Sequence, residues 1–592
     1  MSIIKRYTLL FFIILAIVIT LLMVKYRWVG NNGHEWQSII DGDGKGYYAY
    51  LEEIFINHNF GSSVTDNDQI YFVNNHSVIK FFSGTALLIS PFFLSAKIIA
   101  TIFHLPAQAY AETFQKSVSI AALFYLFLGF WFLIRLCRSL NIKRINSFIS
   151  LLLILFATNL LTYSIFHPAM SHVYSFCAIS GFLWAINQNI ITGRNIFLLI
   201  SSVILGIVYL IRPVNIIIVA FVPFFFSDLS EMFLFLKTRI KHILIFLGIF
   251  ILLCFLQNIL WFLQCGSFLI DVYPHEGFYW LHPEIFKVLF SFRKGLFIYS
   301  PAVFFSLLGL ISIFKMNKFK ALIGLFFILI LVYLISSWWC WSYFDGFGMR
   351  PFIDFYGVLA LFLAFLFNNI QKWLRYFFII CVLFPISLNL IQTYQYTKGI
   401  IHPDYMNLSA YRYVFLKTSN AYINRIGGSN DIVPYNKYKK NLIYESIAYP
   451  EASAVDTSNT IIPKGETEMA FIYNHKIPVN FLLQFDNDTS LINSNKLFAE
   501  IALKKRELSP CKFSDDLLVV SIKYNDNHNT FYRSFPLDYL PIHLSNKWEQ
   551  LDYRIILPAI QSENYQLKFY IWNKGLDNFL IKDIHIKIYK TN

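Results

Sequence analysis

The residues best suited to chemistry lie in Asp41-Gly-Asp-Gly-Lys-Gly-Tyr-Tyr-Ala-Tyr50, which begins soon after the first hydrophobic segment ends. Asp41 and Asp43 are separated by one glycine and followed by more, so the backbone around them can approach a ligand closely. A carboxylate at this point can take a proton from an attacking hydroxyl and orient it. A solvated turn and a calcium-like Asp-x-Asp-Gly loop are the alternatives, although the remaining calcium ligands and the distal Glu are missing.

Cations that could bind a phosphate occur at the ends of later hydrophobic segments. Arg212 precedes Pro213, the pair Arg293 and Lys294 lies in an aromatic turn, and Arg350 follows a tryptophan-rich segment. Guanidinium groups match phosphate oxygens bidentately. The alternative for each is that a long basic side chain reaches the lipid headgroups from the end of a membrane span.

Polar and aromatic neighbours complete the candidate substrate site. His167 and His172 flank a short Pro-containing turn, where they could hydrogen-bond a phosphate or an acceptor, or cap a helix. Two histidines alone do not indicate a zinc site. Tyr47, Tyr48 and the acid Asp345 beside the tryptophans are suited to contact a sugar, although interfacial aromatic residues also serve lipid contact. Asp354 is a further acid in the same region.

The elements that must position these residues cross a membrane. Of the 592 residues, 56% are hydrophobic and only 14% are charged, which excludes an ordinary soluble protein. The net charge of +14 arises mainly in short loops between apolar segments. We therefore attribute it to membrane topology rather than to nucleic-acid binding.

The hydropathy pattern predicts about eleven membrane spans. Basic residues gather in alternate loops, which places the N-terminus inside and the C-terminal tail outside a bacterial-type plasma (inner) membrane. The apolar stretch 84–104 is interrupted by Pro91, Lys97 and His104, so we predict an interfacial helix pair there instead of a crossing. The predicted spans are 7–24, 117–136, 147–165, 173–192, 195–211, 214–233, 242–263, 298–314, 321–338, 352–369 and 375–392.

The domain organisation follows from the change in composition along the chain. Residues 1–395 form the membrane domain, whose first outer loop is 25–116, and 396–430 form a linker. Residues 431–592 are polar, with strand-length apolar or alternating segments at 516–524, 565–572 and 581–589. This tail predicts an antiparallel, jelly-roll-like β-sandwich outside the membrane.

A polytopic protein whose first outer loop carries an acidic motif followed by tyrosine resembles the GT-C glycosyltransferases, such as protein O-mannosyltransferases and aminoarabinose transferases. Asp41-Gly-Asp43 with Tyr47 replaces their Asp-Glu or Asp-x-Asp motif. The resemblance implies an inverting transfer of a hexose or pentose from a polyprenyl-phosphate lipid to a glycan, lipid or protein hydroxyl. It also implies an aspartate base, for which Asp43 is favoured over Asp41, and cations at the phosphate. A divalent cation is compatible with this scheme but is not required by the sequence.

Two other functions fit a polytopic protein of this kind. A transporter or flippase of lipid-linked sugars usually places charges at the middle of the bilayer and often contains inverted repeats. This sequence has its charges at span ends and shows no repeat. A glycan-binding membrane scaffold is the other alternative, but eleven spans exceed what an anchor needs.

Overall fold

The computed structural model divides the chain into two compact units. One contains residues 1–341 and 347–393, and the other contains 342–346 and 394–592. The structure describes residues 3–30, 33–60, 70–73, 76–273, 276–423, 426, 441–448, 460–463, 466, 468–474, 476–477, 479–492, 497–508, 516–524, 530–537, 548–560, 564–574 and 578–590.

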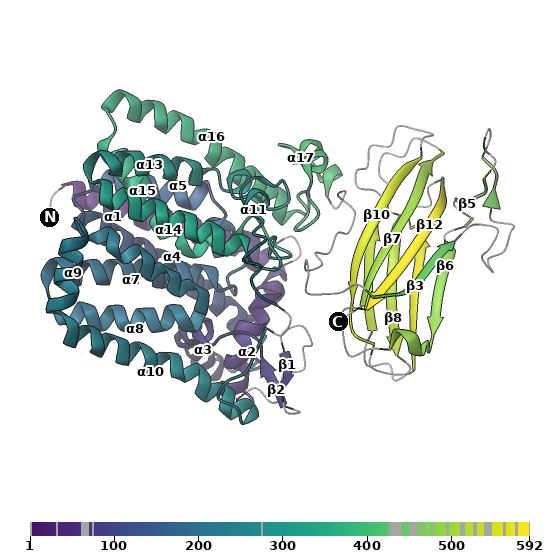
Figure 1. Cartoon of the computed structure of the whole chain (residues 1–592), viewed down its shortest axis with the longest axis horizontal. Helices are drawn as coiled ribbons and strands as arrows, with labels where there is room; N and C mark the ends of the chain where they lie inside the picture. The colour runs from purple at the N-terminus through teal and green to yellow at the C-terminus, as the bar shows by residue number, and fades with distance from the viewer. Residues whose placement is uncertain are drawn as a thin grey trace. The chain divides into compact units, whose positions relative to one another are not determined.

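The first unit is a bundle of apolar helices, most of which are seen lengthwise in Figure 1. The helices before residue 170 are α1 (Ile3–Met23), η1 (Val24–Val29), η2 (Glu35–Ser38), α2 (Asp43–Phe55), α3 (Gly84–Ile102), α4 (Glu112–Ser139), α5 (Arg144–Phe156) and α6 (Leu160–Ile165), with a hairpin of β1 (Ile70–Val73) and β2 (His76–Ile79). The later ones are α7 (His172–Thr192), α8 (Asn195–Ile211), η3 (Pro213–Phe225), α9 (Leu229–Thr238), α10 (Ile240–Cys265), α11 (Ile285–Phe290), α12 (Leu296–Tyr299), α13 (Ala302–Met316), α14 (Lys318–Ser336), η4 (Arg350–Phe355), α15 (Tyr356–Asn369) and α16 (Lys372–Thr397).

The helices confirm the predicted membrane class of the first unit. Among the described residues, seven helices are long and apolar enough to cross a bilayer, or eight if one bent pair forms a single span. Three further apolar helices have 10–17 residues. Leu21 on α1 and Leu252 on α10 are more than 60% exposed, as expected where a helix faces lipid.

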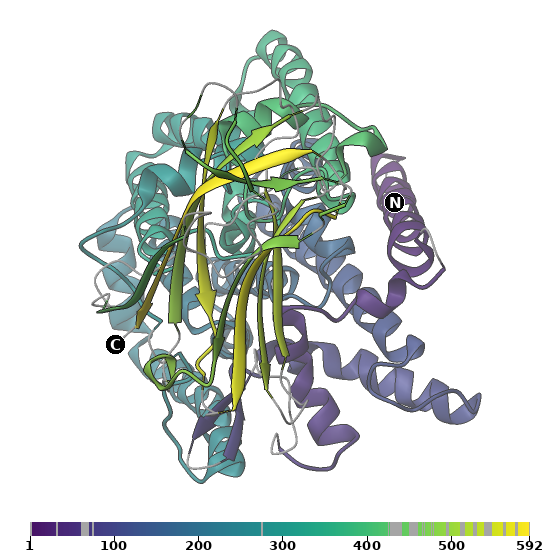
Figure 2. The same cartoon turned by 90° about the vertical axis from the view of Figure 1, so that its right-hand side faces the viewer.

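The predicted helix pair at 84–104 is wrong, because the structure shows one continuous helix, α3. Pro91 lies inside it without ending it, and the Ser95 hydroxyl donates to the Pro91 carbonyl. Figure 1 shows α3 nearly end-on, whereas Figure 2 shows it lengthwise. The helix therefore lies across the direction of the bundle, and its length and composition also allow a membrane span.

The span predicted at 214–233 is not one continuous helix. The structure contains η3 and α9 instead, which meet at an angle of 108°. Pro223 lies near the end of η3, and the Asp228 side chain accepts from the Glu231 amide and so starts a new helix. Asp228 is a residue type that often caps a helix, but the apolar residues on both sides of it suggest one uninterrupted span.

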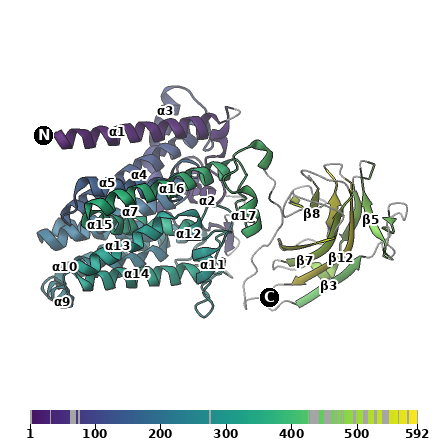
Figure 3. The ribbon, with the colours of Figure 1, turned by 90° about the horizontal axis from the view of Figure 1, so that it is seen from above.

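The second unit contains the predicted antiparallel β-sandwich (Figures 2 and 3). One sheet has the order β10-β7-β12-β5-β4, with β3 also paired to β12, and the other has the order β6-β11-β8-β9. Side chains of both sheets, including Leu503, Ile522, Phe569 and Ile586, share one buried core. The strands are β3 (Asn441–Ala448), β4 (Thr460–Ile461), β5 (Ala470–Tyr473), β6 (Val479–Asp486), β7 (Leu497–Glu507), β8 (Leu517–Tyr524), β9 (Thr530–Pro536), β10 (Glu549–Leu557), β11 (Tyr565–Trp572) and β12 (Phe579–Lys590); α17 (Leu408–Val414) precedes them.

Candidate active site

Asp43 is the first residue of α2, so the glycine-rich stretch forms the N-terminus of a helix and not an extended loop. The helix N-terminus favours a negative charge at this point. Gly42 precedes it with a φ of 53°, a conformation that glycine adopts without strain. At Gly44, an added Cβ atom would lie 2.7 Å from the Ala169 Cβ atom. The absence of a side chain at Gly44 thus lets the start of α2 pack against the loop that precedes α7.

Asp43 forms an ion pair with Arg350, the residue that begins η4. The Arg350 Nη2 atom donates to Asp43 Oδ2 at 2.8 Å, and the side chains of Arg350 and Asp43 are 13% and 35% exposed. Buried hydrogen bonds hold the segment that leads to Arg350. Asn159 Nδ2 donates to the Phe347 carbonyl, and the Tyr356 hydroxyl donates to Asn159 Oδ1. The ion pair joins two residues that lie 307 positions apart in the sequence.

A second charged cluster lies beside the first, around the buried carboxylate of Asp354. His172 Nδ1 lies 2.7 Å from Asp354 Oδ1, and Asn215 Nδ2 donates to Asp354 Oδ2 at 2.7 Å. Because a carboxylate only accepts, this geometry indicates that Nδ1 of His172 carries the proton. Arg212 Nη1 lies 3.5 Å from Asp354 Oδ2, and its side chain remains 23% exposed. Asp354 thus orients His172, which is buried, and Arg212, which can still reach solvent or substrate.

His167 and Lys294 connect the two clusters electrostatically. Burial, together with the charges of Arg27, Arg350, His172 and Lys294, lowers the pKa of His167 to about 3. The imidazole is therefore neutral at physiological pH and available for hydrogen bonding. Lys294 is almost fully buried, and its charge acts on His167. The charge of the Arg350 guanidinium also acts on the Tyr163 hydroxyl, and the Tyr163 ring lies 5.3 Å from the ring of His167.

Tyr47 faces the same site from the first turn of α2. Its hydroxyl lies near the Ser171 side chain and is influenced by the charges of Arg212, Asp43 and Arg350. Burial raises the pKa of Tyr47 above its usual range, so the hydroxyl stays a neutral donor. The structure thus brings together seven predicted residues: Asp43, Tyr47, His167, His172, Arg212, Lys294 and Arg350.

The other four predicted residues are Asp41, Tyr48, Arg293 and Asp345. Asp41 is exposed and its Oδ1 atom accepts from the next amide at 2.8 Å, which makes it part of the turn. The predicted sugar contact of Tyr48 is wrong in this structure, because its buried hydroxyl donates to the Ala109 carbonyl at 2.6 Å. The Arg293 guanidinium lies 5.9 Å from the centre of the Trp341 ring. Asp345 belongs to the short segment 342–346 that groups with the second unit.

Sequence reasoning missed the amides and hydroxyls that hold this site. Asn159 and Asn215 are buried side chains within apolar segments, and Tyr163 is a buried hydroxyl. A polar amide at membrane depth is a usable signal, since it needs a hydrogen-bond partner. The ion pair of Lys80 with Glu276, 2.7 Å apart, was also missed. Among the described residues, no group of three or more His, Cys, Asp or Glu could hold a metal ion.

Comparisons with known proteins found structural likenesses alone, since neither family models nor curated proteins match the sequence. The AglB oligosaccharyltransferase of Archaeoglobus fulgidus, in complex with an inhibitory peptide and a dolichol-phosphate, is 15% identical with a TM-score of 0.40, over 67% of this chain and 56% of that one. The arabinosyltransferase EmbB of Mycobacterium smegmatis is 10% identical with a TM-score of 0.34, over 100% of this chain and 68% of that one.

The chain therefore spans about half the length of the AglB chain that it matches. A xylan-binding CBM22-1 domain of Paenibacillus barcinonensis Xyn10C is 11% identical with a TM-score of 0.18, over 26% of this chain and 97% of that one. AglB is an oligosaccharyltransferase and EmbB is an arabinosyltransferase. All these TM-scores lie below 0.5, so the likenesses carry no argument about activity.

Proposed function

We propose that this multi-pass membrane protein transfers a sugar from a polyprenyl-phosphate lipid to an acceptor hydroxyl at the outer face of the plasma membrane. The observation that carries the proposal is the 2.8 Å pair of Asp43 with Arg350 beside Arg212 and Lys294. It joins an accessible carboxylate to several cations, as the transfer of a sugar away from a phosphate requires.

The cations near Asp43 are of a kind that binds a phosphate. Arg350 uses one Nη2–H on Asp43, and a guanidinium has five N–H donors in a planar fork. We propose that the donor phosphate competes with Asp43 for this fork. Arg212, held by Asp354 and partly exposed, supplies a second fork. Lys294 adds positive charge close to His167.

The proposed reaction has a single displacement at the anomeric carbon. The Asp43 carboxylate accepts the proton of the acceptor hydroxyl, whose oxygen forms the new bond to that carbon. The bond from the carbon to the phosphate oxygen breaks, and polyprenyl phosphate leaves with the electron pair and the charge that Arg350 and Arg212 offset. Attack from the face opposite the phosphate inverts the anomeric configuration. Tyr47 and the neutral His167 are placed to hydrogen-bond sugar or acceptor hydroxyls.

The β-sandwich offers a face suited to a glycan acceptor. On the outer side of the sheet β6-β11-β8-β9, Leu482 is paired with Tyr570, and Ser521 with Tyr532. The Tyr570 and Tyr532 hydroxyls lie close to each other, and Tyr532 is 53% exposed. The amides of Gln484 and Gln566 both donate to Asp486 on the same face. Aromatic rings beside amides and a carboxylate can stack on sugar rings and bind their hydroxyls.

The test of the proposed function is a transfer assay with the full-length protein in lipid bilayers. Polyprenyl phosphates carrying a labelled hexose or pentose are the donors, and isolated cell-envelope glycans are the acceptors. Labelled product that depends on Asp43 and Arg350 supports transfer. Movement of the intact labelled lipid between leaflets, without release of polyprenyl phosphate, contradicts it. For the acceptor face, the double variant Y532A/Y570A should lower retention of those glycans while the same protein still releases polyprenyl phosphate.

A further inference from the structure

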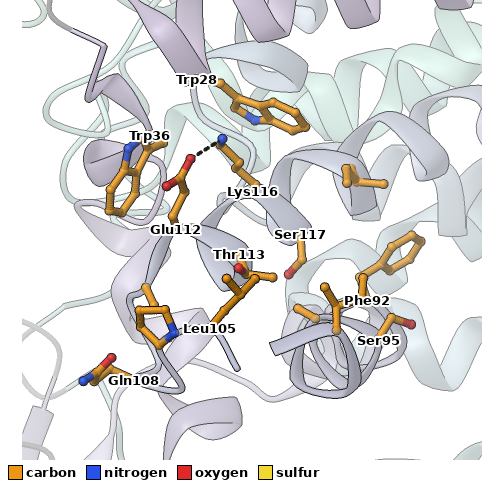
Figure 4. A pocket seen from close by; sticks show the side chains of 15 residues that line it. Trp28, Trp36, Phe92, Ser95, Leu105, Gln108, Glu112, Thr113, Lys116 and Ser117 are labelled. Atoms are coloured by element: carbon orange, nitrogen blue, oxygen red, sulfur yellow. Dashed lines mark hydrogen bonds and ion pairs between the residues drawn. The ribbon is translucent and has the colours of Figure 1, made fainter. Parts of the chain in front are cut away.

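A separate cavity of about 810 Å³ lies between α3, α4 and the segment that follows α1 (Figure 4). One wall is apolar and contains Phe92, Ala96, Ile99 and Ile120. The other carries Trp28, Trp36, Glu112 and Lys116, and Figure 4 shows these side chains together at one end. The size is that of a small-molecule site.

The apolar wall continues onto the outer surface of the bundle. Ile99 on α3 and Ile120 on α4 line the cavity and are 45% and 47% exposed. Next to them, Ile102, Phe103 and Phe124 are 63%, 67% and 50% exposed. Large apolar side chains exposed in a row on a membrane protein face lipid chains. The cavity is thus continuous with the surface that acyl chains cover, so that a chain can enter it from the bilayer.

The polar end contains a donor that has no partner among the described residues. The Trp28 Nε1 atom is buried without a hydrogen bond, and an unsatisfied buried donor costs free energy. Lys116 forms an ion pair with Glu112, and its ammonium lies 5.0 Å from the centre of the Trp28 ring. The lysine and glutamate side chains are 29% and 52% exposed. A ligand at this end therefore meets an N–H donor, an ammonium and a carboxylate.

We propose that the cavity binds a zwitterionic phospholipid with a primary-amine headgroup. Its phosphate or ester oxygen accepts from Trp28 Nε1 and Lys116, its ammonium pairs with Glu112, and one acyl chain lies against Phe92 and Ile99. The presence of both charges favours a net-neutral headgroup over an anionic one, because an anion would leave Glu112 without a cation. The proposal does not depend on the sugar-transfer activity.

The bound lipid would stabilise residues 33–40, the segment that leads to Asp41. Arg27 donates to the Ser38 hydroxyl at 2.9 Å, and the Ile40 amide donates to Gln115 on α4 at 3.2 Å. The residue after Gln115 is Lys116, one of the cavity residues. Occupancy should therefore reduce hydrogen exchange in residues 33–40 more than elsewhere in the unit.

The experiment uses the full-length protein in nanodiscs of phosphatidylethanolamine, phosphatidylglycerol or an equal mixture. Native mass spectrometry should show retained phosphatidylethanolamine in the wild type and at least fivefold less in Trp28→Phe. Trp131→Phe is the matched control, because Trp131 lies on α4 with Arg135 over its ring at 4.9 Å and does not line the cavity. It should retain lipid as the wild type does.

Glu112→Gln should shift retention from phosphatidylethanolamine toward phosphatidylglycerol. Hydrogen exchange in 33–40 should be slower in phosphatidylethanolamine than in phosphatidylglycerol, and this difference should vanish in Trp28→Phe. Equal retention by Trp28→Phe and Trp131→Phe would overturn the proposal. So would a preference of the wild type for phosphatidylglycerol, or displacement of the lipid by polyprenyl phosphate, which would identify the cavity as a donor site.

Discussion

Replacing Asp43 by Asn separates the chemical role of this residue from its structural one. Asn has nearly the same shape and keeps an oxygen that can accept from Arg350 Nη2, which lies 2.8 Å from the carboxylate. It cannot take a proton from an acceptor hydroxyl. The side chain is 35% exposed, so the lost charge attraction should lower stability by only about 1 kcal/mol.

The expected effect on catalysis is much larger. Removal of a positioned general base typically slows a reaction about 100- to 10,000-fold, which corresponds to about 3 to 5 kcal/mol in the activation free energy. The assay measures release of polyprenyl phosphate from labelled donors by purified Asp43→Asn in nanodiscs, next to its thermal midpoint.

Asp41→Asn is the matched control, since Asp41 is exposed and its carboxylate accepts from the following amide. It should change the rate by less than about threefold, because the loss of an exposed turn contact is worth a few tenths of a kcal/mol. An Asp43→Asn protein that keeps a tenth or more of the wild-type rate would refute the base assignment. Equal losses in both aspartate variants would instead indicate that the turn matters only as a whole.

Three further predictions follow from the same geometry. Arg350→Lys should raise the KM for the lipid donor about tenfold or more, since Lys cannot form the fork that binds a phosphate bidentately; an unchanged KM would remove Arg350 from the donor site. Gly44→Ala should lower stability by about 1 to 3 kcal/mol through overpacking against Ala169, and the double variant with Ala169→Gly should recover most of the loss in thermal midpoint and rate. Because the pKa of His167 is about 3 in the folded state and about 6.5 in an unfolded chain, His167 lowers stability progressively as pH falls from 6.5 toward 3. The thermal midpoint of His167→Gln should therefore depend less on pH in this window, and identical profiles of the two proteins would contradict the depressed pKa.

The sequence predicts the fold class well because its main signals are strong and local. Apolar runs correspond to helices such as α4, α10 and α14, and alternation in the tail corresponds to β8 and β11. The two wrong predictions about helices arise where a rule for helix ends was applied too strictly or where its signal was hard to see. Pro91 was expected to divide a helix that tolerates it, and Asp228 starts a new helix inside an apolar run.

The site was predictable only in part. The sequence shows which residues are charged or aromatic, but it does not show which of them contact one another. Asp43 and Arg350 stand out by charge in apolar surroundings, but nothing in the sequence pairs residues 307 positions apart. Tyr47 and Tyr48 look alike in the sequence. Only the packing of α2 shows that Tyr47 faces the charged cluster, whereas the Tyr48 hydroxyl donates to the Ala109 carbonyl.

The pairing of Asp43 with Arg350 bears on how such a site would act. The Asp43 Oδ2 atom that accepts from Arg350 is not open to an acceptor hydroxyl while this contact lasts. A donor phosphate that competes for Arg350 would therefore free this oxygen as it binds. The acceptor hydroxyl would meet an effective base only when the sugar donor is already in place. In this arrangement the same arginine holds the leaving group and limits wasteful attack by water, since both effects follow from one shared contact.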